Sequence, residues 1–139
     1  MRVSYIGDFP KDIRKIVEPI LDEWLDLLPT WCQQFRVMFD SDTQAVLASS
    51  TNYRNRWATL YITAEWFEQS KEGREIALLH ELIHVLIAPL VNPTSKVLDA
   101  LLKEDSNEKA FAESIFKDGE EAAVEDMANA IYRMVRKTT

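Results

Sequence analysis

The stretch that decides the fold is REIALLHELIHVLIAPL, residues 74–90, an apolar run that holds both histidines of the chain. Its apolar residues face nearly every side of a helix, which predicts a helix buried in the core. His80 and His84 are four residues apart and therefore lie on one face of that helix. An ionised Glu81 in this setting is costly unless a positive charge compensates it. The run therefore predicts a buried helix with a functional site on one face.

The histidine spacing is suited to metal binding. Two imidazoles at this spacing can bind one metal ion, and Glu81 points about 100° further around the helix, where it can reach a water on the metal. This H-E-x-x-H arrangement is typical of zinc peptidases. The alternative interpretation is a pair of core histidines satisfied by local hydrogen bonds, with Glu81 on an exposed edge.

A third ligand has to come from elsewhere in the chain. Catalytic zinc usually takes three protein ligands and one water, and the sequence has no third histidine. The ligand is therefore a carboxylate, Cys32, or missing. The last predicted helix offers three glutamates, and Asp99 is a further candidate. The three are Glu120, Glu121 and Glu125.

The motif HELIH, followed downstream by EAAVE at 121–125, resembles the gluzincins, the thermolysin-type zinc peptidases. The resemblance implies that His80, His84 and Glu121 bind Zn²⁺ and that Glu81 is the general base. It also implies that Glu125 is not a ligand but supports one of the two histidines from outside the ligand set. The spacing agrees, because Glu121 and Glu125 are four residues apart and share one helical face.

The resemblance covers roughly residues 30–137 and has two departures. The chain is much smaller than thermolysin-like enzymes and is closer in size to the small prokaryotic and phage zincin domains called minigluzincins. It also lacks the downstream histidine that thermolysin-like enzymes place near the oxyanion. Four other residues are candidates for that donor, namely Tyr53, Tyr61, Tyr132 and Arg133.

Composition limits the classes of function. A length of 139 residues with 47% apolar content predicts one globular domain, residues 1–139. The net charge of −7 argues against nucleic acids and anionic membranes as partners. The single cysteine, the absence of a secretory signal and the absence of a long uncharged apolar run together predict a cytoplasmic protein.

The order of elements predicts an α+β fold, a compact zincin-like domain with a small mixed β-sheet packed on helices. Its active-site helix covers about 72–88, and a C-terminal helix at about 119–137 carries the third ligand. Strands are predicted at 2–6, 31–40, 44–49 and 56–67. Other helices are predicted at 11–29, 94–104 and 107–117, with a kink or restart at Pro19, a stop at Pro89 and a break at 118–119. The resemblance implies that strand 56–67 is the sheet edge that pairs with the substrate.

These patterns predict a zinc-dependent metallopeptidase that hydrolyses a peptide or protein through a zinc-activated water, with Glu81 as the base. The alternative is a non-catalytic zincin-fold zinc protein that acts as a binding or regulatory module. A helical protein without any metal is the third hypothesis. The sequence indicates no particular oligomeric state.

Overall fold

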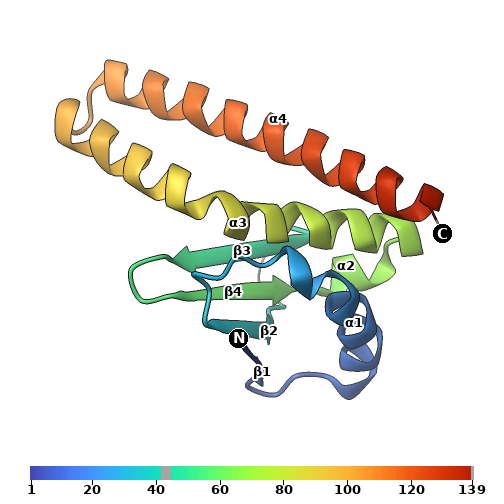
Figure 1. Ribbon diagram of the computed structural model, residues 1–139. Coiled ribbons are helices and arrows are strands. Elements are labelled where there is room, and N and C mark those ends of the chain that lie inside the picture. Colours follow the sequence, from blue (N-terminus) through green and yellow to red (C-terminus); the bar gives the residue numbers. More distant parts are fainter. Residues whose placement is uncertain (42–44, 139) are drawn as a thin grey trace.

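The computed structural model describes residues 1–41 and 45–138 and has an α+β architecture, as the sequence predicts (Figure 1). The strands are β1 (Arg2–Ile6), β2 (Gln34–Phe39), β3 (Leu47–Asn52) and β4 (Trp57–Ile62). The helices are α1 (Lys11–Trp24), a 3₁₀ turn (Leu25–Leu27), α2 (Ala64–Glu68), α3 (Lys71–Leu101) and α4 (Asn107–Thr138).

The four strands form one mixed sheet in the order β1-β2-β4-β3. β1, β2 and β4 are parallel, whereas β3 runs antiparallel to β4. The mixed sheet of the prediction is thus confirmed. The register aligns Tyr5, Val37, Leu60 and Ser49 across the four strands. Ser49 consequently lies on the sheet face that carries buried core residues.

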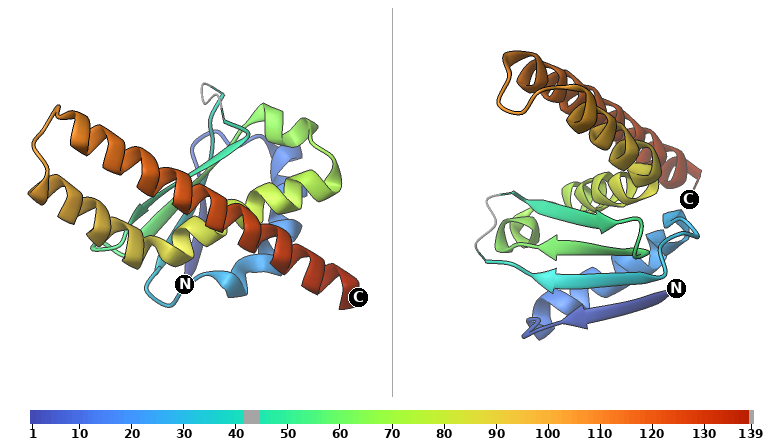
Figure 2. Two further views of the ribbon diagram at one scale, coloured as in Figure 1. Left: turned by 90° about the horizontal axis from the view of Figure 1, so that it is seen from above. Right: turned by 90° about the vertical axis from the view of Figure 1, so that its left-hand side faces the viewer.

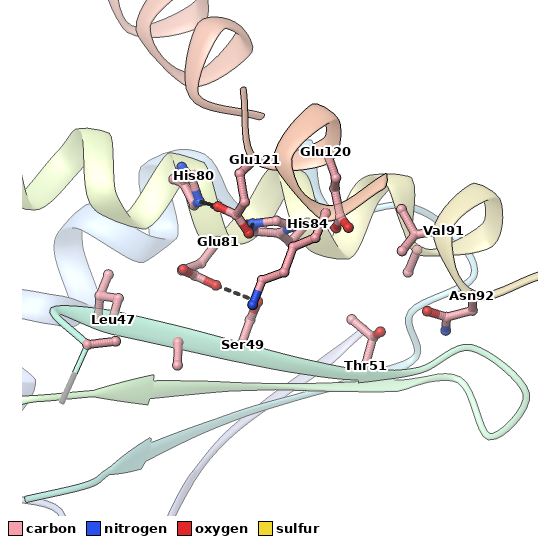
Figure 3. Close-up of a pocket in the computed structure, with 14 residues that line it drawn as sticks. Leu47, Ser49, Thr51, His80, Glu81, His84, Val91, Asn92, Glu120 and Glu121 are labelled. Atoms are coloured by element: carbon pink, nitrogen blue, oxygen red, sulfur yellow. Dashed lines mark hydrogen bonds and ion pairs between the residues drawn. The ribbon is translucent and has the colours of Figure 1, made fainter. Parts of the chain in front are cut away.

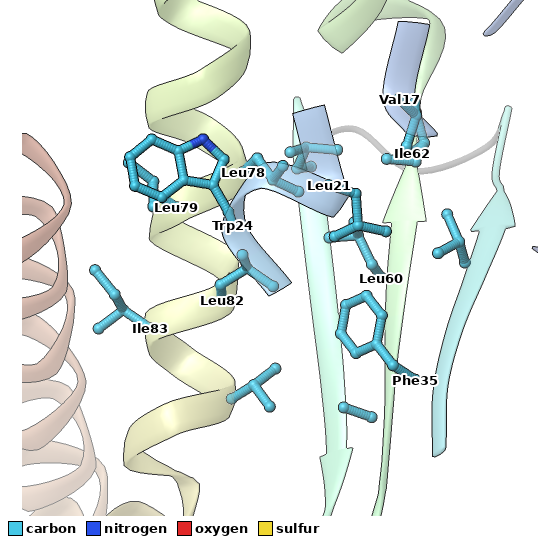
Figure 4. Close-up of a cluster of buried hydrophobic side chains, with 14 of the residues drawn as sticks. Val17, Leu21, Trp24, Phe35, Leu60, Ile62, Leu78, Leu79, Leu82 and Ile83 are labelled. Atoms are coloured by element: carbon cyan, nitrogen blue, oxygen red, sulfur yellow. The ribbon is translucent and has the colours of Figure 1, made fainter. Parts of the chain in front are cut away.

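One hydrophobic core joins the sheet to α1, to the first half of α3 and, through Val124 and Ala128, to α4 (Figure 4). Alternate residues of β2 and β4 are fully buried, as expected for strands covered on that face. On the helix side, Leu78, Leu79, Leu82 and Ile83 of α3 pack against Leu21 and Trp24 of α1 in the same cluster. The run at 74–90 is therefore a core helix, which fixes its polar face relative to the sheet.

α3 begins as the sequence predicts but ends later. Ser70 is its N-cap and accepts a hydrogen bond from the backbone N–H of Gly73 at 3.1 Å. The predicted stop at Pro89 is wrong, because the helix continues through Pro89 and Pro93 to Leu101. The segment predicted as a separate helix at 94–104 is its last part. The second half of α3 projects beyond the sheet and packs beside α4 (Figures 1 and 2).

α4 is also longer than predicted. The two helices predicted at 107–117 and about 119–137 are one helix, and the break expected at 118–119 is wrong. Gly119 takes part in the helix without a break. A glycine costs a helix only about 1 kcal/mol relative to alanine, which packing against a neighbouring helix easily offsets.

The edge strand differs from the prediction. The segment 56–67 is not a single edge strand: β4 lies inside the sheet, between β2 and β3, and the chain after it turns into α2. The edge nearest to α3 is β3, which overlaps the strand predicted at 44–49; Gln44 lies outside the described residues. Thr63 accounts for the early end of β4, because its side chain accepts a hydrogen bond from Trp66 N–H and caps α2.

α1 is shorter than the predicted helix 11–29, since it ends at Trp24 and a 3₁₀ turn follows. It continues through Pro19 without a restart. α3 is long and apolar enough to cross a membrane by length and composition, a test that the core helix of a soluble protein also passes.

Candidate metal centre

The two histidines face each other on α3. Their Nε2 atoms are 3.1 Å apart and the ring centroids 4.8 Å apart. Both side chains are mostly buried, at 18% exposure for His80 and 15% for His84. The i, i+4 spacing places them on one face, and the core packing of the opposite face of α3 directs them toward α4.

Glu121 of α4 completes a group of three donor side chains (Figure 3). One carboxylate oxygen is 3.1 Å from His80 Nε2 and the other is 3.3 Å from His84 Nε2. The donor atoms of these three residues all lie within 4.8 Å of one another, an arrangement that can hold a metal ion. The third ligand expected from the sequence therefore lies beside both histidines.

The distances fit a small tetrahedral ion. Bonds of about 2.0–2.2 Å to nitrogen and oxygen, at tetrahedral angles, separate two ligands by about 3.3–3.6 Å. The separations of 3.1 to 3.3 Å are only slightly shorter. Two imidazole nitrogens and one carboxylate are also a donor set that Zn²⁺ accepts. The group fits Zn²⁺ by geometry and by ligand type, although other divalent ions share these preferences.

Each imidazole has a carboxylate on its outer nitrogen. His80 Nδ1 is 3.1 Å from Glu125, and His84 Nδ1 is 2.9 Å from Glu120. Asn129 in turn donates to Glu125 at 3.0 Å. When each Nδ1–H donates to its carboxylate, both Nε2 lone pairs point toward Glu121. Three acceptors then face one another, and only a cation or an extra proton removes their repulsion.

Glu120 lies outside the donor group, on the far side of the His84 ring. The sequence offered it as an alternative third ligand, but it contacts Nδ1 of His84, the nitrogen turned away from the donor group. Its side chain is 16% exposed, against 58% for Glu125. Sequence spacing did not suggest this contact, because Glu120 pairs across helices with a residue of α3.

Glu81 points away from the donor group and toward β3. Ser49 Oγ donates a hydrogen bond of 2.5 Å to Glu81 Oε2. Both residues line a cavity of about 610 Å³ that also contains His80, His84 and Glu121. The Glu81 carboxylate is thus held between the donor group and the sheet edge. No sequence motif pointed to Ser49, since the contact depends on the pairing of β3.

The remaining candidate ligands lie elsewhere. Asp99 forms an ion pair with Lys109 at 3.2 Å on the projecting part of the helices. Cys32 is a core residue, 2% exposed, whose thiol donates to the carbonyl of Gln34. Burial raises the pKa of the Cys32 thiol, which disfavours the thiolate that a metal requires.

The four residues considered as oxyanion donors do not line the cavity that contains Glu81. Tyr61 contacts Ser50, whose side chain points to the opposite sheet face from Ser49. Tyr132 lies near Arg136, in a separate cavity. The lysine that does line the cavity is Lys117 of α4, which the sequence reasoning missed.

Comparisons with models of protein families, with curated proteins and with solved structures found no match to this chain.

Proposed function

We propose that the protein is a zinc-dependent metallopeptidase that hydrolyses a peptide or protein amide bond. One observation carries the proposal: three donor atoms converge beside a carboxylate that is not part of their group. A purely structural metal site needs the three donors but has no use for Glu81. The proposal includes a zincin-like fold of the minigluzincin type.

His80, His84 and Glu121 would hold the metal, and Glu120 and Glu125 would keep the two imidazoles in one tautomer and orientation. Bound Zn²⁺ supplies Lewis-acid polarisation of a carbonyl and a lowered pKa for water. Glu81 accepts a proton from the attacking water and passes it to the leaving amine. Ser49 holds the Glu81 carboxylate in the cavity through its hydrogen bond.

β3 provides the place for the substrate backbone. It is an edge strand that lines the same cavity through Leu47, Ser49 and Thr51. An extended peptide that adds to this edge gains backbone hydrogen bonds and brings a peptide group close to Glu81. This assigns to β3 the role that the sequence suggested for segment 56–67.

Elemental analysis of the protein and of two variants tests the proposal, together with cleavage of a mixed peptide library. Wild-type protein should bind about one zinc per chain and cleave peptides. Glu81→Gln should keep the zinc and lose cleavage, whereas Glu121→Gln should lose or weaken zinc binding. Asp126→Asn removes an exposed acid from the same helix and should change neither property.

Two results would contradict the proposal. Absence of zinc after reconstitution of the wild type would leave the histidines as a hydrogen-bonded pair. Zinc binding without cleavage of any library peptide would instead favour the non-catalytic zinc protein.

A further inference from the structure

The cavity at the metal centre continues along β3 in both directions. Toward the end of the strand it shares Thr51 and Asn92 with a second cavity of about 700 Å³. Toward the start of the strand it shares Leu47 and Glu81 with a third cavity of about 370 Å³. The three cavities therefore follow the edge strand in sequence, with the metal centre in the middle.

The two ends of this cleft differ in chemistry. The end at the start of β3 is bordered by the aliphatic side chains of Val46, Ile76 and Ala77 and by Glu125 and Asn129 of α4. The far end is bordered by the two cations Arg54 and Lys96 and by one acid, Asp99. A cleft with aliphatic groups and an acid at one end and an excess of cations at the other distinguishes the direction and composition of a bound chain.

The cations at the far end have charge available for a ligand. Among the described residues, neither Arg54 nor Lys96 forms an ion pair. Asp99, the acid in the same cavity, is 3.2 Å from Lys109, a cation that it shares with Glu104. The turn that carries Arg54 is fixed, because Asn55 N–H donates to the side chain of Asn52 at 2.9 Å.

Charge distribution in the rest of the cleft strengthens the contrast. The chain has a net charge of −7, and the metal centre itself contains a group of glutamates. In the middle of the cleft, Lys117 and a bound metal would already face the three glutamates, whereas Arg54 and Lys96 offer a carboxylate two cations at the far end. The far end is therefore a favourable position for an acidic group of the bound chain.

We infer that Arg54 and Lys96 form a subsite for a carboxylate of the substrate, a conclusion that rests on the proposed peptidase function. β3 advances about 3.3 Å per residue, so a chain paired with it reaches from Ser49 to the turn in about three to five residues. The carboxylate belongs to a side chain or to a free C-terminus at that distance from the cleaved bond. An aliphatic residue occupies the opposite end of the cleft.

The orientation of the bound substrate decides whether the carboxylate comes from a side chain or from a free C-terminus. A substrate antiparallel to β3 places its N-terminal part at the far end, where only an acidic side chain can supply the carboxylate. A parallel substrate places its C-terminal part there, and the free C-terminus then becomes a second source. Antiparallel pairing is the commoner arrangement between neighbouring strands.

Matched fluorogenic peptides test the subsite with the zinc-loaded full chain. The peptides share an aliphatic core and carry one Glu, or Gln in its place, at each of five positions on either side of the cleaved bond. Each is made with a free or an amidated C-terminus. We expect Glu three to five residues N-terminal to the bond to raise kcat/KM about tenfold over Gln, mainly through KM.

The double variant Arg54→Gln/Lys96→Gln should lose this preference and cleave the Glu and Gln peptides with equal kcat/KM. Lys103→Gln/Arg133→Gln removes the same charge from exposed positions outside the cleft and should retain the preference. High salt should reduce the preference in the wild type.

A binding measurement separates this inference from the peptidase proposal. Anisotropy of labelled Glu and Gln peptides on Glu81→Gln protein should show the same tenfold difference without any turnover. Cleavage with equal kcat/KM for all Glu and Gln peptides would overturn the subsite and leave the peptidase intact. Absence of both cleavage and peptide binding would overturn the two together.

Discussion

At the scale of single residues, both nitrogens of each imidazole have a carboxylate partner in the candidate metal centre. The Nε2 atoms face Glu121, and the Nδ1 atoms contact Glu120 and Glu125. The outer contacts hold each ring in one orientation, and with a metal on the Nε2 atoms they would keep the proton on Nδ1. This pre-organisation predicts that the outer carboxylates affect metal affinity without being ligands.

Glu120→Gln and Glu125→Gln should each weaken zinc binding by about 10- to 100-fold, the usual effect of losing an outer carboxylate. The effect should be larger for Glu120, whose side chain is much less exposed. Competition with a chromophoric chelator measures both constants. Equal zinc affinity in both variants and the wild type would show that the outer carboxylates do not orient the rings.

Ser49→Ala should lower kcat about tenfold, because a hydrogen bond to a charged carboxylate contributes roughly that much when it positions a reacting group. Zinc affinity and KM should stay close to their wild-type values, since Ser49 contacts Glu81 and none of the three donors. Ser49→Thr keeps the hydroxyl and should recover most of the rate. A loss of zinc in Ser49→Ala would instead assign Ser49 a structural role.

Sequence reasoning found the residues of the site that share one helix. His80 and His84 follow from a spacing of four positions, which helix geometry converts directly into a common face, and Glu81 follows from its place one residue after His80. Ser49 and Lys117 join the same cavity from β3 and α4. Their positions depend on strand pairing and on how α4 packs against α3, neither of which leaves a local pattern.

At the scale of elements, the boundaries of α3 and α4 were the main errors of prediction. Proline and glycine raise the cost of a helix locally, but they end it only when nothing else stabilises the next turn. Here each helix continues beside the other, so the interhelical packing offsets the local cost. The prediction from sequence treated each helix as isolated and therefore broke it at Pro89 and Gly119.

Gly119→Ala should stabilise the protein by about 1 kcal/mol, because alanine is the better helix former and a Cβ at this position meets nothing within 4 Å. Gly7→Ala is the matched control: Gly7 also has free space, but its φ of +73° should make alanine destabilising by about 1 kcal/mol. Urea unfolding measures both. Destabilisation by Gly119→Ala would mean that α4 bends at this residue in solution.

A second prediction concerns the contact that holds α1, α3 and α4 together at Arg136. Its guanidinium contacts Glu75, which is 2% exposed, and donates to Glu23 at 2.7 and 2.9 Å. Arg136→Gln should cost about 3 kcal/mol, because it leaves the buried Glu75 without its cation. Urea unfolding at neutral pH measures the loss, and a loss below about 1 kcal/mol would contradict this assignment.

The contact between Arg136 and Glu23 makes the stability of the protein depend on pH, and the direction of that dependence follows from the pKa of Glu23. The Arg136 hydrogen bond holds the pKa of Glu23 below its ordinary value. The stability that Glu23 contributes is therefore present above its unfolded pKa of about 4.3 and is lost as the pH falls through the lower folded value. Glu23→Gln should remove that part of the acid dependence and cost at most about 1 kcal/mol at pH 7, since the carboxylate is exposed.

At the scale of the whole molecule, the candidate metal centre connects parts that are distant in sequence. α3 packs directly on the sheet, whereas α4 lies on the outer side of α3 and adds Val124 and Ala128 to the core. Coordination by His80, His84 and Glu121 would add a second link between α4 and α3. The α+β class followed from the order of strand and helix patterns, but the order of strands in the sheet did not, because no local pattern encodes which strands pair.

Zinc should therefore stabilise the whole protein. Binding to the folded state alone contributes about 4 kcal/mol when free zinc is a thousandfold above its Kd. The midpoint of urea unfolding should fall after treatment with a chelator and return when zinc is added. His84→Ala should be insensitive to both treatments. Identical midpoints for the treated and reloaded wild type would contradict a metal that bridges the two helices.

The position of the third donor on the last helix also affects how the protein is made. A ribosome releases His80, Glu81 and His84 well before Glu121, and chains fold progressively from the N-terminus during synthesis. The nascent polypeptide can thus pair its strands and pack α1 and α3 on the sheet while the group of His80, His84 and Glu121 is still incomplete. Under the proposed function, the growing chain and its ribosomal neighbours are protected from premature proteolysis until α4 folds back onto α3.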